Sequence, residues 1–482
     1  MRALDGLVIL VYLVAIAAIG LRLSGRQGDA RAYFVGERDL PWWAICFSIV
    51  ATETSTLTVI SVPGVAYAGA FGFVELAIGY IIGRSLVAGL LLPLYMRDGF
   101  VSCYQYLRER FGPVLQAVAS VTFLVTRLLA EGVRLFASAI PIKLLLDAVG
   151  VPTDYVTIIA VLSLVTVLYT YVGGIRAVIW TDAIQMGVYL GGAAVCVAVL
   201  LHQVGVGGLS AAYAAGKFQV FNFTAPVLFS PFNAVAAVVG GALFGMASHG
   251  TDQLMVQRVL AARTLRDGRL AMVGSGVTVG IQFALFSLIG ALLWVHLGGR
   301  TVAELGLRST DDLFPRFILD ELPPGLSGLM IAGILSATMG SLSSALNSMA
   351  NSTVADLLRP LWRTDEAATL RLSRVLTIVW AVVMAGFASL FTDTKSSVVL
   401  LGLGIAGYSY GALLGAFLLG RLVPRASGRD AVAAFLVTIA VMAVVVRTYA
   451  LAFTWYVPLG VLVTLVVGGL LSLTHGAERR AA

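Results

Sequence analysis

The sequence contains few charged residues, and this shortage excludes an ordinary soluble domain. Asp, Glu, Lys and Arg make up 12% of the 482 residues, whereas about 25% is usual for soluble domains. Hydrophobic residues make up 59%, and the mean hydropathy is +0.94. A soluble fold could not bury this much apolar surface, so lipid has to surround many of the side chains. The composition therefore predicts an all-α integral membrane protein.

Cysteine and histidine are also scarce, and their positions argue against a metalloenzyme. The three cysteines lie in or near apolar stretches at no metal-binding spacing, as is typical of small buried side chains. The four histidines are scattered, and the sequence has neither an HExxH motif nor a glycine-rich phosphate loop. We therefore expect no enzymatic activity.

The sequence is instead rich in long apolar segments. Thirteen segments are long enough, or nearly so, to cross a bilayer. They cover residues 3–22, 41–69, 71–97, 114–146, 153–172, 177–202, 229–257, 270–298, 324–356, 370–391, 396–420, 428–447 and 453–473. The first segment has no clear small-residue cleavage site and is followed by arginines, so we interpret it as a membrane helix rather than a signal peptide.

Positive charges are distributed unevenly between the loops. If the N-terminus lies outside, the inside loops hold 21 of the 32 Lys and Arg residues and the outside loops hold eight. This asymmetry follows the positive-inside rule and favours an odd number of helices. It predicts a multi-pass protein of the plasma (inner) membrane with a cytoplasmic C-terminus. It also accounts for the isoelectric point of about 9.4 without a nucleic-acid partner.

Two segments carry polar residues and glycine at depths that lipid does not tolerate. The second contains SIVATETSTLTVISVPG at 48–64, and the seventh contains GALFGMASHGTDQLMVQR at 241–258. Both are typical of helices that break near the middle of the membrane, and such breaks persist only against a binding cavity. Because the breaks are five helices apart, we predict two five-helix repeats of inverted topology. The predicted parts are an extra N-terminal helix (1–24), the repeats (41–202 and 229–420) and two C-terminal helices (428–473).

A third polar run lies in the ninth segment, GILSATMGSLSSALNSMANS at 333–352. Ala337, Ser341, Ser344 and Ser348 recur at helical spacing and share one face. Small residues in such a stripe often serve only to let membrane helices pack closely. Opposite a broken helix, however, free carbonyls and hydroxyls would form the oxygen cage that a hard cation needs. Both interpretations stay open at this point.

Several charged residues lie within the apolar segments. Asp182 is either a functional carboxylate or a residue near a helix start that balances Arg176. Arg127, Glu131 and Arg134 share one helix face at i, i+4 and i+7. Glu131 neutralises only one of the two arginines, so the other either binds an anionic ligand or extends to the membrane surface.

Four stretches of the chain resemble the sodium/solute symporter family, which includes the sodium–glucose, proline, pantothenate and sialic acid transporters. They are YFVGERDLPWWAICFSIVATETSTLTVISVPG (33–64), YTYVGGIRAVIWTDAIQ (169–185), GTDQLMVQR (250–258) and LSSALNS (342–348). The similarity covers nearly the whole chain in the same order. It implies a LeuT-type fold with a 5+5 inverted repeat, and Na⁺ as the coupling ion.

The resemblance implies a sodium site between the second and ninth segments. Ala51 and Thr54 would contribute carbonyl oxygens from the break, Ala337 a carbonyl oxygen and Ser341 a hydroxyl. The family usually has a second hydroxyl at the position of Gly340. This chain therefore lacks one ligand, which water could replace.

Some members of the family hold a further Na⁺ with an aspartate and serines. The matching positions here are Asp182, Ser343 and Ser344. All three residues can offer the oxygen ligands that a hard cation prefers. The resemblance therefore implies a second sodium site.

The expected solute pocket departs from that of the sugar transporters. Ser248 and His249 stand where sugar transporters of the family have a gating tyrosine and a tryptophan, so a sugar is disfavoured. Tyr408 and Tyr410 are candidate lining residues, although tyrosines in membrane helices more often pack or lie at the interface. The positions that match solute contacts in the family are Glu53, Ser55 and Thr58.

These features predict a Na⁺-coupled symporter that imports a small organic solute by alternating access. A carboxylate or an amino acid is favoured over a sugar, with Arg134 as the partner of the carboxylate group. The alternative is a sensor of the same fold that binds the solute without transport, which would need an output domain that we do not expect after the last helix. We expect the solute, Na⁺ and the lipid bilayer as partners of a monomer, and no nucleic acid.

Overall fold

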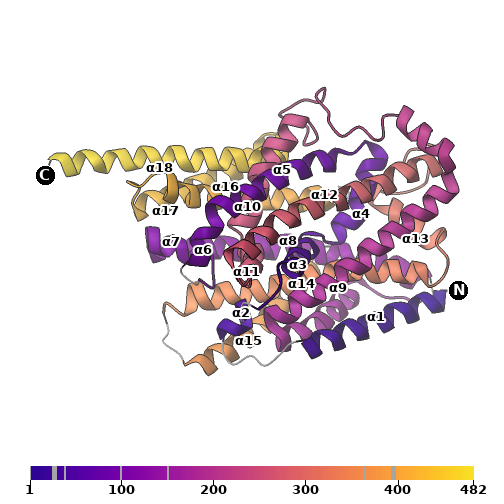
Figure 1. Ribbon diagram of the computed structural model, residues 1–482, viewed down its shortest axis with the longest axis horizontal. Helices are drawn as coiled ribbons and strands as arrows, with labels where there is room; N and C mark the ends of the chain where they lie inside the picture. The colour runs from indigo at the N-terminus through magenta and orange to yellow at the C-terminus, as the bar shows by residue number, and fades with distance from the viewer. Residues whose placement is uncertain are drawn as a thin grey trace.

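The computed structural model describes residues 2–23, 30–36, 39–97, 100–148, 151–361, 365–391 and 398–481. Within these ranges the regular structure is helical, and the β-type pairing is limited to an isolated bridge between Leu40 and Ala262. Figure 1 shows one bundle in which most of the long helices run along the long axis of the molecule. The predicted all-α class is confirmed.

The chain before residue 230 forms nine helices within the described ranges. A π-helical stretch at residues 87–91 joins the fifth and sixth of them. The helices are α1 (Arg2–Leu23), α2 (Ala30–Val35), α3 (Trp42–Glu53), α4 (Thr56–Ala68), α5 (Gly72–Leu86), α6 (Leu92–Arg97), α7 (Tyr104–Phe111), α8 (Pro113–Ala148) and α9 (Tyr155–Ala214).

The second part of the chain forms nine more helices in the described residues. A π-helical stretch at 236–240 precedes the first of them. They are α10 (Gly241–Gly250), α11 (Gln253–Leu260), α12 (Leu265–His296), α13 (Leu313–Asp320), α14 (Leu326–Ser352), α15 (Glu366–Ala388), α16 (Val398–Leu422), α17 (Gly428–Thr448) and α18 (Tyr456–Ala481).

Eleven spans among the described residues are long and apolar enough to cross a bilayer, and α3 with α4 makes a twelfth, bent span. α9 supplies two of the eleven because Gly174, at φ 54°, interrupts the helix. The expected segment at 229–257 is not among them, because it is divided between the short helices α10 and α11. Each predicted segment thus has a helical counterpart, and the predicted number of thirteen is approximate.

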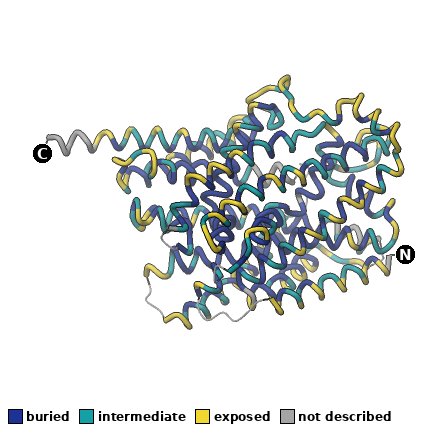
Figure 2. Tube along the Cα trace, viewed as in Figure 1, coloured by how far each residue is buried: buried dark blue, intermediate teal, exposed yellow. Residues whose placement is uncertain are grey.

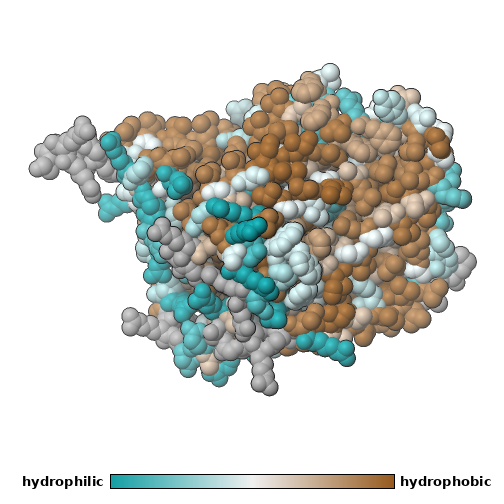
Figure 3. All heavy atoms as spheres, viewed as in Figure 1, coloured by the Kyte–Doolittle hydropathy of each residue, from teal (hydrophilic) through white to brown (hydrophobic). Residues whose placement is uncertain are grey.

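The surface carries the apolar side chains that a lipid-facing protein needs. Figure 3 shows hydrophobic side chains across the middle of the visible face and hydrophilic ones towards its two ends. On α1, Leu7, Leu10, Val11 and Val14 are each more than half exposed. Such exposure is stable only against lipid or another protein. The chain is therefore a multi-pass membrane protein.

α14 is the central helix of the bundle. In its most apolar 18-residue stretch 94% of the residues are buried, compared with 17% in the corresponding stretch of α1. It packs against α9, α8 and α1, and Figure 2 shows buried backbone concentrated in the middle of the molecule. The serines of α14 therefore lie inside the protein and not against lipid.

Both predicted helix breaks are present. Thr54 and Ser55 separate α3 from α4, and the two helices are bent by 65°. Thr251 and Asp252 separate α10 from α11. Pro63 takes no part in the first break, because it lies inside α4. The limits of the two inverted repeats stay a prediction.

Candidate functional site

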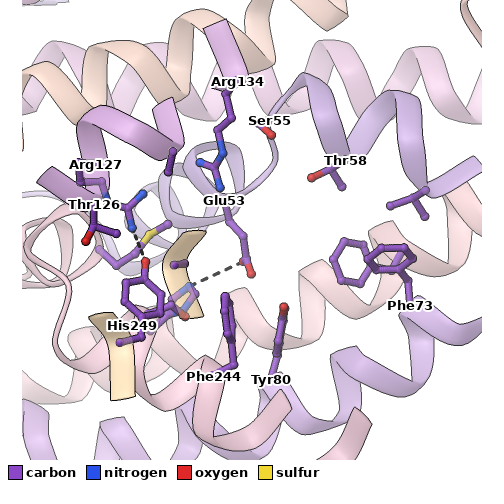
Figure 4. Close-up of a pocket in the computed structure, with 17 residues that line it drawn as sticks. Glu53, Ser55, Thr58, Phe73, Tyr80, Thr126, Arg127, Arg134, Phe244 and His249 are labelled. Carbon is purple, nitrogen blue, oxygen red and sulfur yellow. Dashed lines mark hydrogen bonds and ion pairs between the residues drawn. The ribbon is translucent and has the colours of Figure 1, made fainter. Parts of the chain in front are cut away.

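A cavity lies beside the first break and is bordered by α3, α4, α5, α8, α10, α11, α12 and α16. The space between the lining residues is about 810 Å³ when the open solvent that it joins is included. Six of the seven predicted solute contacts line it, and Figure 4 shows several of them facing the same space. They are Glu53, Ser55, Thr58, Arg134, Ser248 and His249.

Tyr408, the seventh predicted contact, does not line the cavity. It is 38% exposed, whereas Tyr410 is buried and lies in the cavity wall. Two residues along an α-helix are about 200° apart, so the two tyrosines of α16 point to nearly opposite sides. Of the two candidate tyrosines, the structure brings Tyr410 to the cavity and leaves Tyr408 outside it.

Arg127 is the centre of a buried ionic cluster at one end of the cavity. Its Nε and Nη2 both donate to Oδ2 of Asp252, at 3.1 Å from Nε. Its Nη1 donates to Glu131 at 3.1 Å, and Nη2 also donates to the Tyr410 hydroxyl at 2.5 Å. Arg127 is therefore fully engaged by the chain itself. The sequence identified the Glu131 contact but missed Asp252, although a carboxylate inside a membrane helix was a visible signal.

Arg134 has a different environment on the same helix. Its Nη1 donates to Oε1 of Glu131 at 2.9 Å, the oxygen that Arg127 also contacts. The side chain is 20% exposed, and Nε is buried without a partner among the described residues. Glu131 was expected to neutralise only one of the two arginines, and in the structure a single oxygen of Glu131 contacts both. Most of the five N–H donors of Arg134 are nevertheless available to a ligand.

Glu53 projects into the cavity from the end of α3. It forms an ion pair with the fully buried Arg84 of α5, which also donates to the Ser275 hydroxyl at 2.9 Å. His249 Nε2 lies 3.7 Å from Oε2 of Glu53, and its Nδ1 lies 2.8 Å from the Ser248 hydroxyl. The sequence placed Arg84 within a span but did not connect it with Glu53.

Aromatic side chains form the opposite wall. Phe244 stacks on Tyr80 with ring centroids 5.9 Å apart, and it packs against Tyr410 at 5.5 Å. Phe73 and Phe283 meet edge to face at 5.2 Å. The cavity therefore combines an apolar wall with arginine and carboxylate groups. Such an arrangement suits a small ligand that has an apolar body and a charged end.

The end of α3 and the middle of α14 lie in contact, as a sodium site between them requires. Because α3 ends at Glu53, the carbonyls of Ala51 and Thr52 lack a partner in a next helical turn. The Ser341 hydroxyl of α14 donates to the carbonyls of Thr52 at 3.1 Å and Ala337 at 3.0 Å. These oxygen atoms are of the type that a hard cation binds, so the residues fit Na⁺.

Thr54 and Gly340 complete the set of residues predicted for this site. The Thr54 hydroxyl donates to Gln282 at 2.8 Å, so its carbonyl is the group that remains for an ion. Gly340 lies in α14 and faces Asp182 and Gln185. The structure thus brings Ala51, Ala337, Gly340 and Ser341 together, while the role of these residues and of Thr54 as ligands stays a prediction.

Asp182 is buried at the junction of α9, α3 and α14. Its Oδ2 accepts hydrogen bonds from Ser48 at 2.7 Å and Thr52 at 3.3 Å, and Arg258 Nη2 lies 3.4 Å away. The alternative role, balancing Arg176, was wrong, because Arg176 lies 2.6 Å from another carboxylate, Asp39.

Ser343 and Ser344, the serines predicted to share an ion with Asp182, have hydroxyls that are already engaged. Ser344 accepts from Arg258 and lies 3.2 Å from the Thr52 hydroxyl. Ser343 donates to the carbonyl of Gly340 at 3.1 Å. Ser344 lies 3.5 Å from Oδ2 of Asp182. A hydroxyl that donates its hydrogen still has oxygen lone pairs for an ion, so the role of both serines as ligands stays a prediction.

Comparison with known proteins gives consistent matches. The sequence model of one protein family, described as the Sodium:solute symporter family, matches residues 33–438. The human sodium/iodide cotransporter is 29% identical over 86% of this chain, which spans 65% of that protein. The sodium/sialic acid symporter SiaT of Proteus mirabilis (strain HI4320) is 28% identical over 95% of this chain and 92% of its own length.

The fold is also similar to that of a solved structure. A substrate-bound, outward-open structure of a Na⁺-coupled sialic acid symporter superposes with a TM-score of 0.87. The sequence identity is 25%, and the match covers 98% of each chain. This agreement confirms the LeuT-type class that the family resemblance implied.

Proposed function

Because this chain belongs to the sodium:solute symporter family, we propose that it uses Na⁺ to import a small organic solute with a carboxylate group. The family and the relatives are sodium-coupled transporters and not enzymes, and Na⁺ is the coupling ion. What we propose is the chemical class of the solute, its transport into the cell and the alternating-access mechanism. Its main support is the guanidinium of Arg134, which lines the cavity, is only partly buried and is partly unpaired among the described residues.

Arg134 is the arginine that a carboxylate can reach. Within the described part of the chain, Arg127 makes four hydrogen bonds through its guanidinium, whereas Arg134 makes one. A carboxylate binds a guanidinium through two parallel hydrogen bonds, so Arg134 offers a fork and Arg127 does not. The aromatic wall opposite would hold the apolar part of the solute. The similar proteins are named for iodide and for sialic acid, and both of these travel as anions.

The balance of charges around the cavity gives a reason why binding of the solute would be coupled to binding of Na⁺. Around the cavity the described arginines are Arg84, Arg127 and Arg134, and the described carboxylates are Glu53, Glu131 and Asp252. These charges cancel, so a bound carboxylate adds one uncompensated negative charge in a site of low dielectric. A cation at the nearby break would offset that charge, and binding of each would favour binding of the other.

Residues of the first break belong to both proposed binding sites, the Na⁺ site and the solute cavity. Ala51 and Thr54 would hold Na⁺ through their carbonyls, together with Ala337 and the Ser341 hydroxyl. Glu53 and Ser55, from the same break, line the solute cavity. Na⁺ would bind more tightly to the outward-open state, solute would favour closure, and loss of Na⁺ inside would release both. Such alternating access requires different affinities in the two states.

The number of Na⁺ ions decides how much the membrane potential contributes. One Na⁺ with a monovalent carboxylate moves no net charge, so a tenfold Na⁺ gradient supplies about 1.4 kcal/mol. Two Na⁺ ions move one net charge, and at ~100 mV they supply roughly 5 kcal/mol in all. We propose the second arrangement, with the further ion at Asp182. We also propose a plasma (inner) membrane location, an outside N-terminus, a cytoplasmic C-terminus and a monomer.

Uptake into proteoliposomes tests the proposal. Purified protein is first screened by thermal shift against small carboxylates, amino acids, sugars and ureides in Na⁺ or K⁺, and the best ligand is then used for transport. We expect a carboxylate to be stabilising only with Na⁺ and to accumulate under a Na⁺ gradient. Equal uptake driven by a proton gradient without Na⁺ would contradict Na⁺ coupling. Binding without any uptake would favour the sensor.

A further inference from the structure

Glu53 is a carboxylate on the wall of the solute cavity, and its two oxygen atoms have different surroundings. Oε2 pairs with the buried Arg84 and lies 3.7 Å from Nε2 of His249. Oε1 makes no hydrogen bond to the described residues, and the side chain is 19% exposed. Because Glu53 lines the cavity, Oε1 is the oxygen that a bound molecule can reach.

Neighbouring side chains fix the position of this carboxylate. Arg84 is fully buried on α5, and its Nη1 donates to the Ser275 hydroxyl of α12 at 2.9 Å, which holds its Nη2 against Glu53. His249 is also buried, and its Nδ1 lies 2.8 Å from the Ser248 hydroxyl. When Ser248 donates this hydrogen bond, the ring hydrogen lies on Nε2 and faces Glu53. Both neighbours of Oε2 are then donors, and Oε1 is left as an acceptor at the cavity.

Arg134 and Glu53 carry opposite charges and line one cavity, but they do not pair with each other. Arg134 pairs with Glu131. Glu53 pairs with Arg84, and no ion pair joins it to Arg134 within the described ranges. Figure 4 shows the side chains of Arg134 and Glu53 directed into the same space. A solute with a carboxylate alone would satisfy Arg134, but it would be repelled by Glu53 and would leave Oε1 without a donor.

We infer that the solute carries, besides its carboxylate, a hydroxyl or amino group that donates a hydrogen bond to Oε1 of Glu53. The inference rests on the proposed binding of the carboxylate by Arg134, and it narrows the solute from carboxylates in general to hydroxy acids and amino acids. A hydroxy acid brings one negative charge into the cavity, whereas an amino acid with a protonated amino group brings none. The nature of the donor therefore decides whether Na⁺ has to compensate the charge of the solute.

A purely structural role of Glu53 is the alternative. Arg84 is fully buried, and a buried guanidinium without a counter-ion is costly, so Glu53 could serve only to neutralise it. In that case a donor on the solute would bring no gain in affinity. The two roles thus make opposite predictions for solutes that differ only in the donor.

The test compares acids that share one carbon skeleton and differ in the donor. The first set is propionate, lactate and alanine, the second is butyrate, γ-hydroxybutyrate and γ-aminobutyrate, and the third is phenylpropionate, phenyllactate and phenylalanine. The sets vary the separation between carboxylate and donor and the size of the apolar part. Affinities for the purified full-length protein in Na⁺ buffer are measured by calorimetry and thermal shift.

The measurements use the wild type, Glu53→Gln, Glu53→Asp and a matched control, Glu75→Gln. Glu75 is a buried glutamate of α5 that accepts from the Asn222 amide at 3.0 Å and does not line the cavity. Glu53→Gln removes the charged acceptor. Glu53→Asp keeps a counter-ion for Arg84 but draws the carboxylate back from the cavity by one methylene group.

In the wild type we expect the hydroxy acid or the amino acid of the best-fitting set to bind roughly ten- to a hundred-fold more tightly than the plain acid, as is usual for a hydrogen bond to a charged group. Glu53→Gln should abolish this preference, and Glu53→Asp should weaken it with little loss of stability. Glu75→Gln should leave it unchanged. Comparison of the hydroxy and amino members of the set identifies the donor.

The outcomes separate the failure of this inference from that of the proposed function. If the plain acids bind as tightly as their derivatives in every set, Glu53 is structural and the inference is wrong, while the proposed carboxylate binding stands. A preference that is unchanged in both Glu53 variants would also overturn it, because the donor would then bind elsewhere. If Glu53→Gln does not fold, the wild type and Glu53→Asp still decide. If none of the acids binds, the carboxylate is wrong, and the proposed function fails together with the inference.

Discussion

The two broken helices differ in what occupies the break. At the break between α10 and α11, Asp252 accepts from the Leu254 amide at 2.9 Å and from the Tyr410 hydroxyl at 2.6 Å, and pairs with Arg127. At the break between α3 and α4, Ser55 makes no side-chain cap, and the free carbonyls of α3 meet the hydroxyl of Ser341. Thus one break is closed by the chain's own charges, whereas the other offers oxygen acceptors to a cation.

The comparison shows that a broken helix does not by itself identify a ligand site. What decides is whether the exposed backbone groups and nearby charges are satisfied by the protein. The second break joins α11 to α8 and α16 through Asp252, so we regard it as a fixed structural connection. At the first break the side chains of Glu53 and Thr54 are held by Arg84 and Gln282, but the carbonyls at the end of α3 have no charged partner, so an ion bound there can change the geometry of the break. Substitutions at the two breaks should therefore differ in their dependence on Na⁺.

The largest effect is expected at the closed break. Asp252→Asn removes a carboxylate that balances the buried Arg127, and losing one partner of a buried pair costs about 3–5 kcal/mol of unfolding free energy. We expect a large fall in melting temperature that is equal in Na⁺ and K⁺. Asp320→Asn is the control, because Asp320 pairs with Arg316 on the exposed surface and should have almost no effect. A loss that appears only in Na⁺ would mean that this break also holds an ion.

Asp182→Asn should have the next largest effect, and this effect should depend on Na⁺. It removes the carboxylate that we propose as a sodium ligand and leaves Arg258 without its ion-pair partner. We expect the Hill coefficient for Na⁺ in uptake to fall from near two towards one. Uptake of a monovalent carboxylate should at the same time lose its dependence on membrane potential, because one Na⁺ then accompanies one negative charge. A wild-type coefficient of one would contradict a second sodium ion.

Much of the fold could be predicted because lipid makes the sequence pattern simple. Apolar length identifies spans such as α1 and α8, and polar residues within a span identify the two breaks. The number of spans was less certain, because α10 and α11 divide one segment into pieces that are each too short. The run at 48–64 predicted a break without fixing its position, and the structure puts it at Thr54 and Ser55 rather than at Pro63.

The contacts of the site were harder to predict than its position. Glu53, Ser55 and His249 were placed in the cavity by motif, but their ion-pair partners lie on other helices, so no local spacing reveals them. Arg84 and Asp252 are examples, since each was visible as a charge in a membrane segment without a partner. Tyr408 and Tyr410 differ only in helix rotation, which a single sequence does not fix.

Within the solute cavity, Arg134 and Arg127 offer a matched comparison on one helix. Arg134→Gln removes the guanidinium that is proposed to bind the carboxylate, and a charged hydrogen-bonded fork contributes about 1.5–3 kcal/mol. We expect the apparent affinity for the solute to fall roughly ten- to a hundred-fold, with only a modest change in melting temperature. Arg127→Gln should mainly destabilise the protein. Normal solute binding by Arg134→Gln, or a neutral solute, would show that Arg134 is structural.

The smallest of these effects is expected at Ser341, the residue at which α14 meets the open break. Ser341→Ala removes one hydroxyl oxygen but leaves the carbonyls of Ala51, Thr54 and Ala337 in place. Loss of one uncharged ligand among several should raise the Na⁺ concentration for half-maximal uptake about tenfold, since a bond to a charged group contributes about 1.5–3 kcal/mol. Stability in K⁺ should change little, because the hydroxyl there bonds only to carbonyls. Ser336→Ala is the control: Ser336 is equally buried on α14 but donates to Tyr12 of α1, so its loss should leave the Na⁺ dependence unchanged. If Ser341→Ala and Ser336→Ala have the same Na⁺ dependence, α14 contacts the open break through packing alone. The proposed difference in Na⁺ binding between the two breaks would then depend on α9, which carries Asp182.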